Sequence, residues 1–218
     1  MRVLAAADVH GNRAVYEWLL VKARENRADA LVLAGDLLGC PDGFGSVEEA
    51  QRHDADALGR SLDEGDLLVL YVMGNDDLVE LEPVSDRVQS LHGRRVQHDR
   101  FAFVGYQYSL PFMGGVFEKP EAGIAADLAG LATLLDANTV FVSHSPAFGI
   151  RDPGFGETRI GSGSFRELLA GHPFCAHIHG HSHAGFGREG SHFNVASAGR
   201  TRAMLIDLET MRHWVLDK

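Results

Sequence analysis

Apolar runs alternate with segments of helical periodicity over the first third of the chain. Three runs that fit strands buried on both faces lie at residues 3–7, 30–34 and 67–73. Apolar residues at helical spacing follow Asn12, a suitable N-cap, and residues 47–62 form a second helical segment. This alternation of strand and helix predicts an α/β fold with parallel strands at its core.

After residue 77 the pattern contains more strands than helices. Helices are expected at residues 124–135 and 165–170, each after a glycine-rich loop. Short apolar runs predict strands at residues 94–96, 101–104, 139–143, 174–178, 193–196, 203–208 and 213–216. We expect the last three of these strands to close a second sheet. Because the sequence shows no internal repeat and no linker, we expect one domain over residues 1–218.

Composition and charge narrow the classes of partner. The chain of 218 residues is 45% hydrophobic, enough for one sizeable core, and its formal net charge is -10. This charge argues against the basic face that broad nucleic-acid binding requires. A phosphate substrate stays compatible with it, because bound cations can dominate the local field. The oligomeric state is not indicated.

Cysteine usage and hydropathy bear on location. The two cysteines, Cys40 and Cys175, do not form a disulfide framework, which favours a reducing compartment. The first apolar run is too short for a signal peptide, and no stretch approaches the roughly 20 apolar residues of a membrane helix. We therefore expect a cytoplasmic protein without a membrane partner.

Five apolar runs are followed directly by polar side chains that can bind metal. These side chains are Asp8, His10, Asp36, Asn75, His144, His181 and His183. Ligands of open α/β sheets bind beyond the carboxyl ends of the strands, so we expect these residues to lie close together. A single such ending fits a capping residue or an Asx turn equally well. Five of them together indicate one shared site.

The donor types of this set favour one kind of metal chemistry. Carboxylate, amide oxygen and imidazole without thiolate suit Mn, Fe or Zn at a catalytic site better than a structural zinc. Seven ligands exceed what one tetrahedral ion needs. They suit two ions about 3.5–4 Å apart, the arrangement that clamps the oxygens of phosphate esters. Asp36, alone at the end of its strand, would then bridge the two ions.

The ordered blocks Asp8-x-His10, Gly35-Asp36, Gly74-Asn75, His144 and Gly180-His181-x-His183 resemble the calcineurin-like metallophosphoesterases. The resemblance covers nearly the whole chain and implies a four-layer α-β-β-α sandwich with two mixed β-sheets. It also implies a ligand set for each of two ions. One ion would be held by Asp8, His10, Asp36 and His183, and the other by Asp36, Asn75, His144 and His181.

The same resemblance implies an activity and a cofactor. It implies hydrolysis of a small phosphate ester by a hydroxide that bridges two divalent metal ions. The expected ions are Mn²⁺, Fe²⁺ or Fe³⁺, with Zn²⁺ as an alternative. The segment from His144 to Gly185 is also similar to phosphodiesterase-like bacterial members, which favours phosphodiesters over phosphomonoesters.

Asp76 departs from the family pattern. The family usually has a histidine after Gly-Asn, and that histidine is thought to protonate the leaving group. An aspartate beside two cations stays ionised and is a poor proton donor. His10 and His53 are the other candidates for this role. We therefore predict slow turnover of esters with basic leaving groups, with Asp36, Asn75 and Asp76 as the catalytic candidates.

Several residues are weaker candidates for contacting the substrate. Asn12 and Asn75 can donate to the phosphate, although Asn12 serves equally well as a helix cap. Three arginines could clamp the phosphate but fit solvated surface positions better; they are Arg13, Arg151 and Arg200. Four aromatic residues could stack on a nucleobase but fit core cover better; they are Tyr106, Tyr108, Phe112 and Phe117. His177 and His179 could support the ligand histidines, although ordinary hydrogen bonding is the simpler interpretation.

Loss of the histidine at position 76 also permits a non-catalytic function. Members of this superfamily can serve as protein-binding scaffolds that have lost catalysis. The complete set of seven candidate ligands argues against that alternative, because a scaffold does not need so many convergent metal ligands. A nuclease is disfavoured by the lack of a basic groove.

Overall fold

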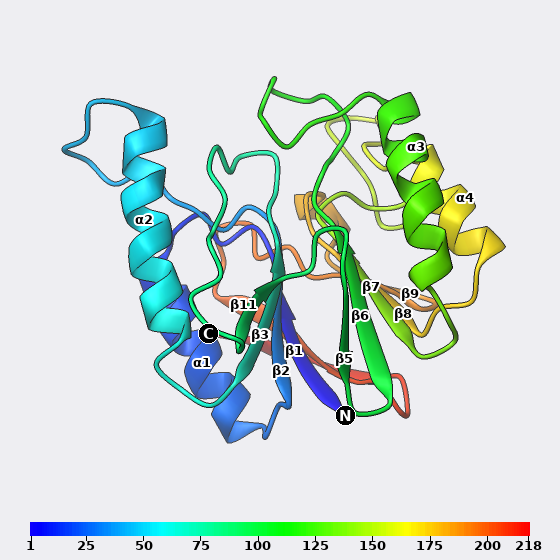
Figure 1. Ribbon diagram of the computed structural model, residues 1–218, viewed down its shortest axis with the longest axis horizontal. Coiled ribbons are helices and arrows are strands. Elements are labelled where there is room, and N and C mark those ends of the chain that lie inside the picture. Colours follow the sequence, from blue (N-terminus) through cyan, green and yellow to red (C-terminus); the bar gives the residue numbers. More distant parts are fainter.

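The computed structural model describes residues 1–218 as two six-stranded sheets with helices on the outside (Figure 1). The first sheet has the order β12 (Arg212–Asp217), β11 (Arg202–Asp207), β1 (Arg2–Ala6), β2 (Ala30–Ala34), β3 (Leu68–Val72) and β4 (Val88–Ser90). The second has the order β5 (Arg95–His98), β6 (Phe101–Tyr106), β7 (Thr139–Ser143), β8 (Ala176–His179), β10 (His192–Asn194) and β9 (Gly187–Glu189). The α-helices are α1 (Arg13–Glu25), α2 (Val47–Leu62), α3 (Glu121–Leu131) and α4 (Gly163–Gly171), and the short 3₁₀ helices are Ala132–Leu134 and His183–Gly185.

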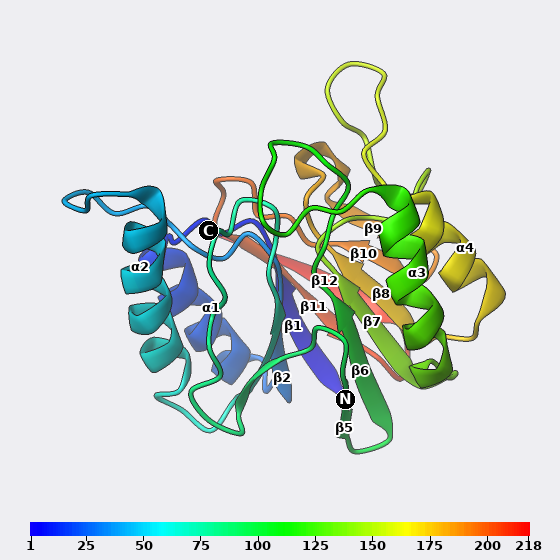
Figure 2. The same cartoon turned by 45° about the horizontal axis from the view of Figure 1, so that its top comes forward.

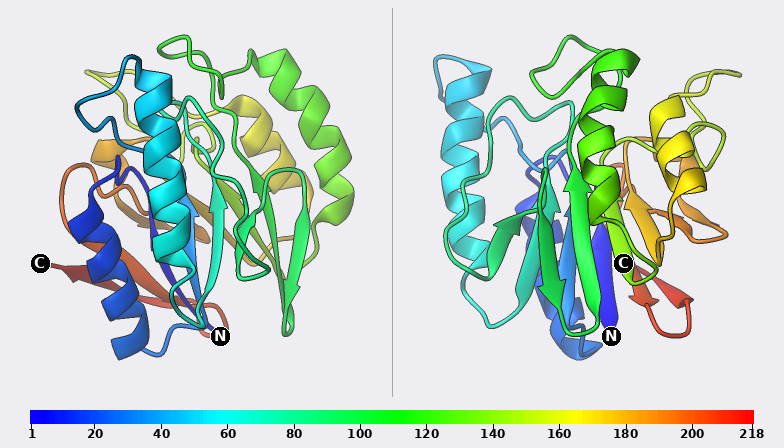
Figure 3. Two further views of the ribbon diagram at one scale, coloured as in Figure 1. Left: turned by 60° about the vertical axis from the view of Figure 1, so that its left-hand side comes forward. Right: turned by 45° about the vertical axis from the view of Figure 1, so that its right-hand side comes forward.

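The layers follow from the alternation of side chains along each strand. In β1, Leu4 and Ala6 belong to a core with α1 and α2, whereas Val3 and Ala5 belong to a core between the two sheets. A third core joins the outer face of the second sheet to α3 and α4. Figure 3 shows the two helix pairs on opposite sides of the sheets. The expected four-layer sandwich with two mixed sheets is confirmed.

Parallel pairing dominates the centre of both sheets. Strands β1, β2, β3 and β4 pair in parallel, as do β6, β7 and β8. Antiparallel strands complete the edges, with β11 and β12 in the first sheet and β5 and β9 in the second. The parallel core that the alternating pattern predicts is therefore present.

The expectation that the last three strands close the second sheet is wrong for two of them. Only β10 joins the second sheet, whereas β11 pairs antiparallel with β1 and β12 pairs with β11 in the first sheet. The apolar pattern of β11 predicts burial on both faces, which either sheet provides. The strand lies beside β1 because its register there pairs Leu205 with Leu4 in the core under α1 and α2, and Ile206 with Val3 in the core between the sheets.

Smaller differences concern short elements. The strands β4 and β9 have three residues each and little apolar pattern, and the sequence did not predict them. Helix α3 begins at Glu121 rather than at residue 124, and after Leu131 the chain tightens into a 3₁₀ turn. Helix α1 begins as expected, because the Oδ1 of Asn12 accepts a hydrogen bond from the amide of Val15. None of the helices has the length and apolarity required to cross a bilayer.

A buried carboxylate joins the segments that follow β2 and β3. The Asp77 side chain is fully buried and accepts hydrogen bonds from the backbone amides of Leu37, Leu38 and Gly74 at 2.8–3.2 Å. Burial, reinforced by the charge of Asp36, raises the pKa of Asp77 to about 7 even though the amides oppose the shift. Asp77 therefore fixes the relative positions of two strand ends.

We predict that Asp77→Ala lowers the free energy of unfolding by about 3 kcal/mol or more, since three buried amides lose their acceptor at about 1–3 kcal/mol each. Urea denaturation followed by circular dichroism measures this change. The matched control is Asp86→Ala, an exposed aspartate in the loop after Asp77, which should stay within about 0.5 kcal/mol of the unmodified chain. Equal urea midpoints for Asp77→Ala and Asp86→Ala would contradict this role of Asp77.

Candidate metal centre

The structure brings the candidate ligands together from the ends of five strands. Asp8 and His10 follow β1, and His183 follows β8. One ligand atom from each of these three residues lies within 4.8 Å of the others. The His183 Nε2 lies 3.2 Å from the Asp8 Oδ1. These side chains form one half of the site.

The other half gathers around His144, which follows β7. Its Nε2 lies 3.4 Å from the Asp36 Oδ2 and 3.0 Å from the Asn75 Oδ1. Its Nδ1 lies 2.9 Å from the carbonyl oxygen of Ala34, which fixes the orientation of the ring. The ring of His181 packs edge-on against it, with 5.0 Å between the ring centroids.

Asp36 lies between the two halves. Its Oδ2 is 3.9 Å from the His10 Nε2 and 3.4 Å from the His144 Nε2. Its Oδ1 accepts a hydrogen bond from the backbone amide of Asp76 at 2.9 Å, which holds the carboxylate in place. A single side chain therefore approaches ligand candidates of both halves.

The backbone around the site is strained. Four candidate ligands adopt a positive φ: Asp8 at 56°, His10 at 48°, Asp36 at 52° and His181 at 63°. This left-handed conformation costs a residue with a side chain roughly 1–2 kcal/mol. Strain of this kind concentrates at functional sites, where the surrounding structure enforces it.

The glycines of the sequence blocks allow close approach to the ligand side chains. A Cβ at Gly35, which has φ +89°, would lie 2.3 Å from the His144 Nδ1. A Cβ at Gly180 would lie 2.5 Å from the Asp8 Oδ2. Both distances are far below van der Waals contact. The glycine that precedes the ligand in these two blocks is therefore a packing requirement of the site.

Charges within the site shift the pKa values of its histidines in opposite directions. Burial disfavours the charged form of His144, but the carboxylates of Asp36 and Asp8 outweigh it and raise the pKa of His144 to about 10. Burial raises the pKa of Asp36, but His144 outweighs this effect and holds that pKa well below its usual range. Burial, reinforced by the charge of His144, lowers the pKa of His181 to about 4. A cation that binds here would displace the proton of His144.

The donor set fits divalent cations. Asp8 and Asp36 are buried, and the hydrogen-bond and ion-pair partners of their carboxylates are histidines and backbone amides. The donors are oxygen and imidazole nitrogen, which suit Mn, Fe or Zn, and no cysteine is among them. Two buried carboxylates with no lysine or arginine partner are the charge arrangement that a pair of cations would neutralise.

Asp76 lies at the edge of the site with a half-exposed side chain. Its Oδ1 accepts a hydrogen bond from the Asn75 Nδ2 at 2.8 Å, and its Oδ2 lies 3.8 Å from the His10 Nδ1. Burial and the charge of Asp36 raise its pKa. The bond to Asn75 turns the amide oxygen of that residue toward His144. By contrast, His53 on α2 packs against the ring of Phe44 and does not line the site.

Other candidates lie outside the cluster of ligands. Asn12 caps α1 and lines neither pocket at the site. Arg13 pairs with Asp54 at 2.6 Å, Arg151 donates to the carbonyl oxygen of Phe186, and Arg200 is exposed. The His177 Nε2 lies 2.8 Å from the Ser143 Oγ and its Nδ1 lies 3.0 Å from the His192 Nδ1, whereas His179 is buried without a hydrogen-bond partner.

The four candidate aromatic residues, at the end of β6 and in the loop that leads to α3, divide into two groups. Tyr106 and Phe117 are buried and Tyr108 packs between them, as expected of residues that cover the core. Phe112 is exposed and contacts His181 edge-on, with 5.5 Å between the ring centroids. Only Phe112 therefore lies at the site.

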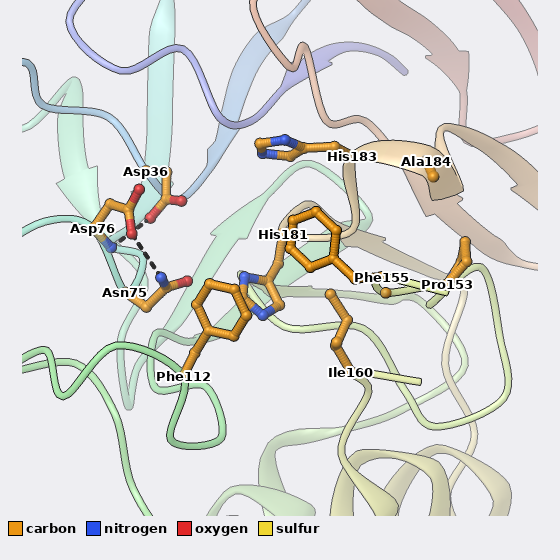
Figure 4. Close-up of a pocket in the computed structure, with 11 residues that line it drawn as sticks. Asp36, Asn75, Asp76, Phe112, Pro153, Phe155, Ile160, His181, His183 and Ala184 are labelled. Atoms are coloured by element: carbon orange, nitrogen blue, oxygen red, sulfur yellow. Dashed lines mark hydrogen bonds between the residues drawn. The ribbon is translucent and has the colours of Figure 1, made fainter. Parts of the chain in front are cut away.

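Two pockets open at the candidate ligands. One, of about 280 Å³, is lined by Asp36, Asn75, Asp76, Phe112, Pro153, Gly154, Phe155, Ile160, His181, His183 and Ala184 (Figure 4). A second, of about 380 Å³, shares Asn75 and Asp76 and extends past His10 to Cys40 and Met113. Neither Phe155 nor Ile160 is expected at the site from the sequence. The only signal was an aromatic residue between two glycines, Gly154-Phe155-Gly156, in a glycine-rich loop.

Comparison with known proteins agrees with this architecture. The family model of the calcineurin-like phosphoesterases matches residues 1–185. The chain is similar to the structure of TT1561 of Thermus thermophilus, with a TM-score of 0.74 and 19% sequence identity over 99% of this chain and 98% of that chain. It is also similar to a dimetal phosphatase from Danio rerio, with a TM-score of 0.61 and 14% identity over 100% of this chain and 98% of that chain. At these identities the likeness concerns the fold.

No curated protein matches the chain by sequence. The family model nevertheless covers most of the chain, including every strand end that carries a candidate ligand. The chain belongs to the calcineurin-like phosphoesterase family.

Proposed function

We propose that this chain is a metal-dependent hydrolase of phosphate esters that works with two divalent cations in the cytoplasm. Asp8, His10, Asp36 and His183 would hold one ion, and Asp36, Asn75, His144 and His181 the other. The observation that carries the proposal is the position of the Asp36 Oδ2, within 3.9 Å of the His10 Nε2 and 3.4 Å of the His144 Nε2. Mn²⁺ or iron suits these donors best, with Zn²⁺ as an alternative.

When bound, such a pair of cations lowers the pKa of a water molecule and neutralises charge on the phosphoryl oxygens. The protein supplies the orientation of the ligands. Asp76 directs the amide oxygen of Asn75 toward the site through the 2.8 Å hydrogen bond from the Asn75 Nδ2. The carbonyl oxygen of Ala34 orients His144, and the amide of His181 donates to the Asp8 Oδ2 at 3.1 Å. These bonds keep the ligands in position before the substrate arrives.

The charge and shape around the site favour phosphodiesters over phosphomonoesters. No lysine or arginine lines either pocket, so cations alone would balance the substrate's charge. A diester carries one negative charge at neutral pH, whereas a monoester carries nearly two. The two pockets meet at Asn75 and Asp76, which gives space for an organic group on each side of one phosphate.

A metal-binding scaffold without catalysis is the alternative function. The half-exposed Asp76 at the family's histidine position favours this alternative, because the histidine that would protonate the leaving group is missing. Of the two other candidates for that role, His10 lies beside Asp76, whereas His53 packs against Phe44. The two functions differ in one observable. A scaffold would bind manganese without hydrolysing any aryl phosphodiester.

We predict that chelation abolishes hydrolysis of bis(p-nitrophenyl) phosphate and that Mn²⁺ restores it with two ions bound per chain. Asp36→Ala should reduce the rate by more than about 100-fold, because loss of even an indirect ligand partner costs 10–100-fold. Calorimetric titration with Mn²⁺ and the rate of p-nitrophenol release measure the two effects. Asp86→Ala is the matched control and should keep both the two bound ions and the rate of hydrolysis.

Full activity after chelation, or in Asp36→Ala, would contradict the proposal. Two bound ions without turnover of the diester would favour the scaffold instead.

We further predict that Asp76→His accelerates hydrolysis of esters with poor leaving groups by at least about 10-fold, since general acid catalysis contributes 10²–10⁴-fold. Esters of p-nitrophenol, which leave without a proton, should change little. The measurement is kcat/KM for a series of aryl phosphodiesters whose leaving groups differ in pKa. Asp76→Asn is the control for loss of the carboxylate. The quantity compared is the slope of log kcat/KM against the pKa of the leaving group. An equal slope for Asp76→His and the unmodified chain would contradict the prediction, because the missing histidine would then not limit these rates.

A further inference from the structure

The pocket of about 280 Å³ beside the candidate metal centre has one polar and one apolar side (Figure 4). The polar side consists of candidate ligands and their neighbours, such as Asp36 and His181. The large apolar side chains on the other side are Phe112, Phe155 and Ile160, which come from two different loops, with the smaller Pro153 and Ala184 beside them. None of the proposed chemistry at the metal centre uses the apolar side.

Phe112 is exposed but held in place. Its side chain is 48% exposed, yet its loop between β6 and α3 is organised by one carboxylate. Glu118 accepts hydrogen bonds from the backbone amides of Phe112, Met113 and Gly114 at 2.8–2.9 Å. The ring then meets His181 edge-on. The loop therefore presents an aromatic ring to the site instead of burying it in the core.

Phe155 belongs to the loop between β7 and α4, and this loop projects from the molecule in Figure 2. Its side chain is 85% exposed. The loop is closed by one hydrogen bond, from the amide of Gly154 to the carbonyl oxygen of Thr158, and at its base the buried Asp152 pairs with Arg159 at 2.7 Å. A large apolar side chain in this position gains nothing from the folded core.

The loop of Phe155 is also tied directly to the segment of the ligand histidines. The Ser182 Oγ donates a hydrogen bond to the carbonyl oxygen of Pro153 at 2.7 Å. Ser182 stands between His181 and His183 in the sequence. This hydrogen bond therefore couples the position of the apolar side of the pocket to that of the candidate metal ligands.

The size and chemistry of the pocket limit what can occupy it. A dry cavity of about 150 Å³ is enough for a benzene ring, so about 280 Å³ accommodates a substituted ring. No lysine or arginine lines the pocket, so a second phosphate or a carboxylate would find no cationic side chain. Aromatic rings prefer offset-stacked or edge-to-face neighbours, and Phe112 and Phe155 provide two such faces.

We propose that Phe112, Phe155 and Ile160 form a binding subsite for an uncharged aromatic group of the phosphate ester. This subsite rests on the proposed function, because the phosphate of the same molecule would lie at the metal centre. The enzyme then selects aryl or nucleobase-like esters over esters of small alcohols. Phe112 and Phe155 determine specificity and take no part in the chemical step.

The test is calorimetric binding of phenylphosphonate, methylphosphonate and hexylphosphonate to the full chain loaded with Mn²⁺. We expect phenylphosphonate to bind about 10-fold or more tightly than methylphosphonate, on the scale of one aromatic stacking contact. Phe112→Ala and Phe155→Ala should each reduce that ratio to within about 3-fold while leaving methylphosphonate affinity unchanged. Phe148→Ala is the matched control, because Phe148 is 49% exposed and lies outside the pocket. This control should keep the full ratio.

The outcomes separate the subsite from the metal centre. If phenylphosphonate and methylphosphonate bind the loaded chain equally well, the subsite is refuted and the proposed function stands. The same holds if Phe112→Ala and Phe155→Ala keep the ratio of the two affinities found for the unmodified chain. If hexylphosphonate binds as tightly as phenylphosphonate, the pocket selects apolar bulk and the aromatic assignment is wrong. If no phosphonate binds to the loaded chain and no diester is hydrolysed, the proposed function fails, and the subsite fails with it.

Discussion

Repulsion between buried carboxylates is the constraint on which the rest of the structure depends. Asp8 and Asp36 are almost completely buried, and each has an oxygen within 4.8 Å of a common His144 nitrogen. Both residues adopt a left-handed backbone that costs free energy. A fold tolerates such an arrangement only when surrounding packing enforces it and compensating charge is supplied. The parallel strands, the close-packed glycines and the buried Asp77 provide the enforcement. Without metal, the raised pKa of His144 lets its imidazolium supply part of this charge, and in our account two cations would take its place.

Sequence reasoning succeeded where local chemistry and strand geometry agree. Buried parallel strands leave a clear apolar pattern, and their carboxyl ends must meet at one edge of a sheet. Asp36, Asn75 and His144 could therefore be placed together from the sequence alone. The four-layer arrangement came from the family resemblance, and the structure confirms it.

Sequence reasoning failed where the outcome depends on pairing over long distances. The pattern of β11 shows that the strand is buried on both faces, but it does not show which sheet contains it. Phe112 and Phe117 have the same residue type and lie in the same loop, yet one lines the pocket and the other fills the core. The difference arises from Glu118, whose carboxylate binds three amides of the loop, and this contact leaves no periodic signal. The position of Phe155 likewise depends on contacts within its own loop, such as the pair of Asp152 with Arg159, which leave no periodic signal in the sequence.

The two loops that line the pocket give the site a division of roles. The candidate metal ligands directly follow central strands of both sheets. The loops after β6 and β7 supply apolar side chains, and such loops can change without disturbing the core. The hydrogen bond from Ser182 to Pro153 connects the two parts. In this account the strand ends bind the phosphate and the loops choose the organic group attached to it.

Anomalous diffraction from crystals grown with Mn²⁺ tests the central claim most directly. Data collected at the manganese absorption edge should show two peaks per chain, about 3.5–4 Å apart, with the carboxylate of Asp36 between them. His10 and His183 should lie beside one peak, and His144 and His181 beside the other. A single peak, or a pair of peaks that Asp36 does not touch, would contradict the two-metal account.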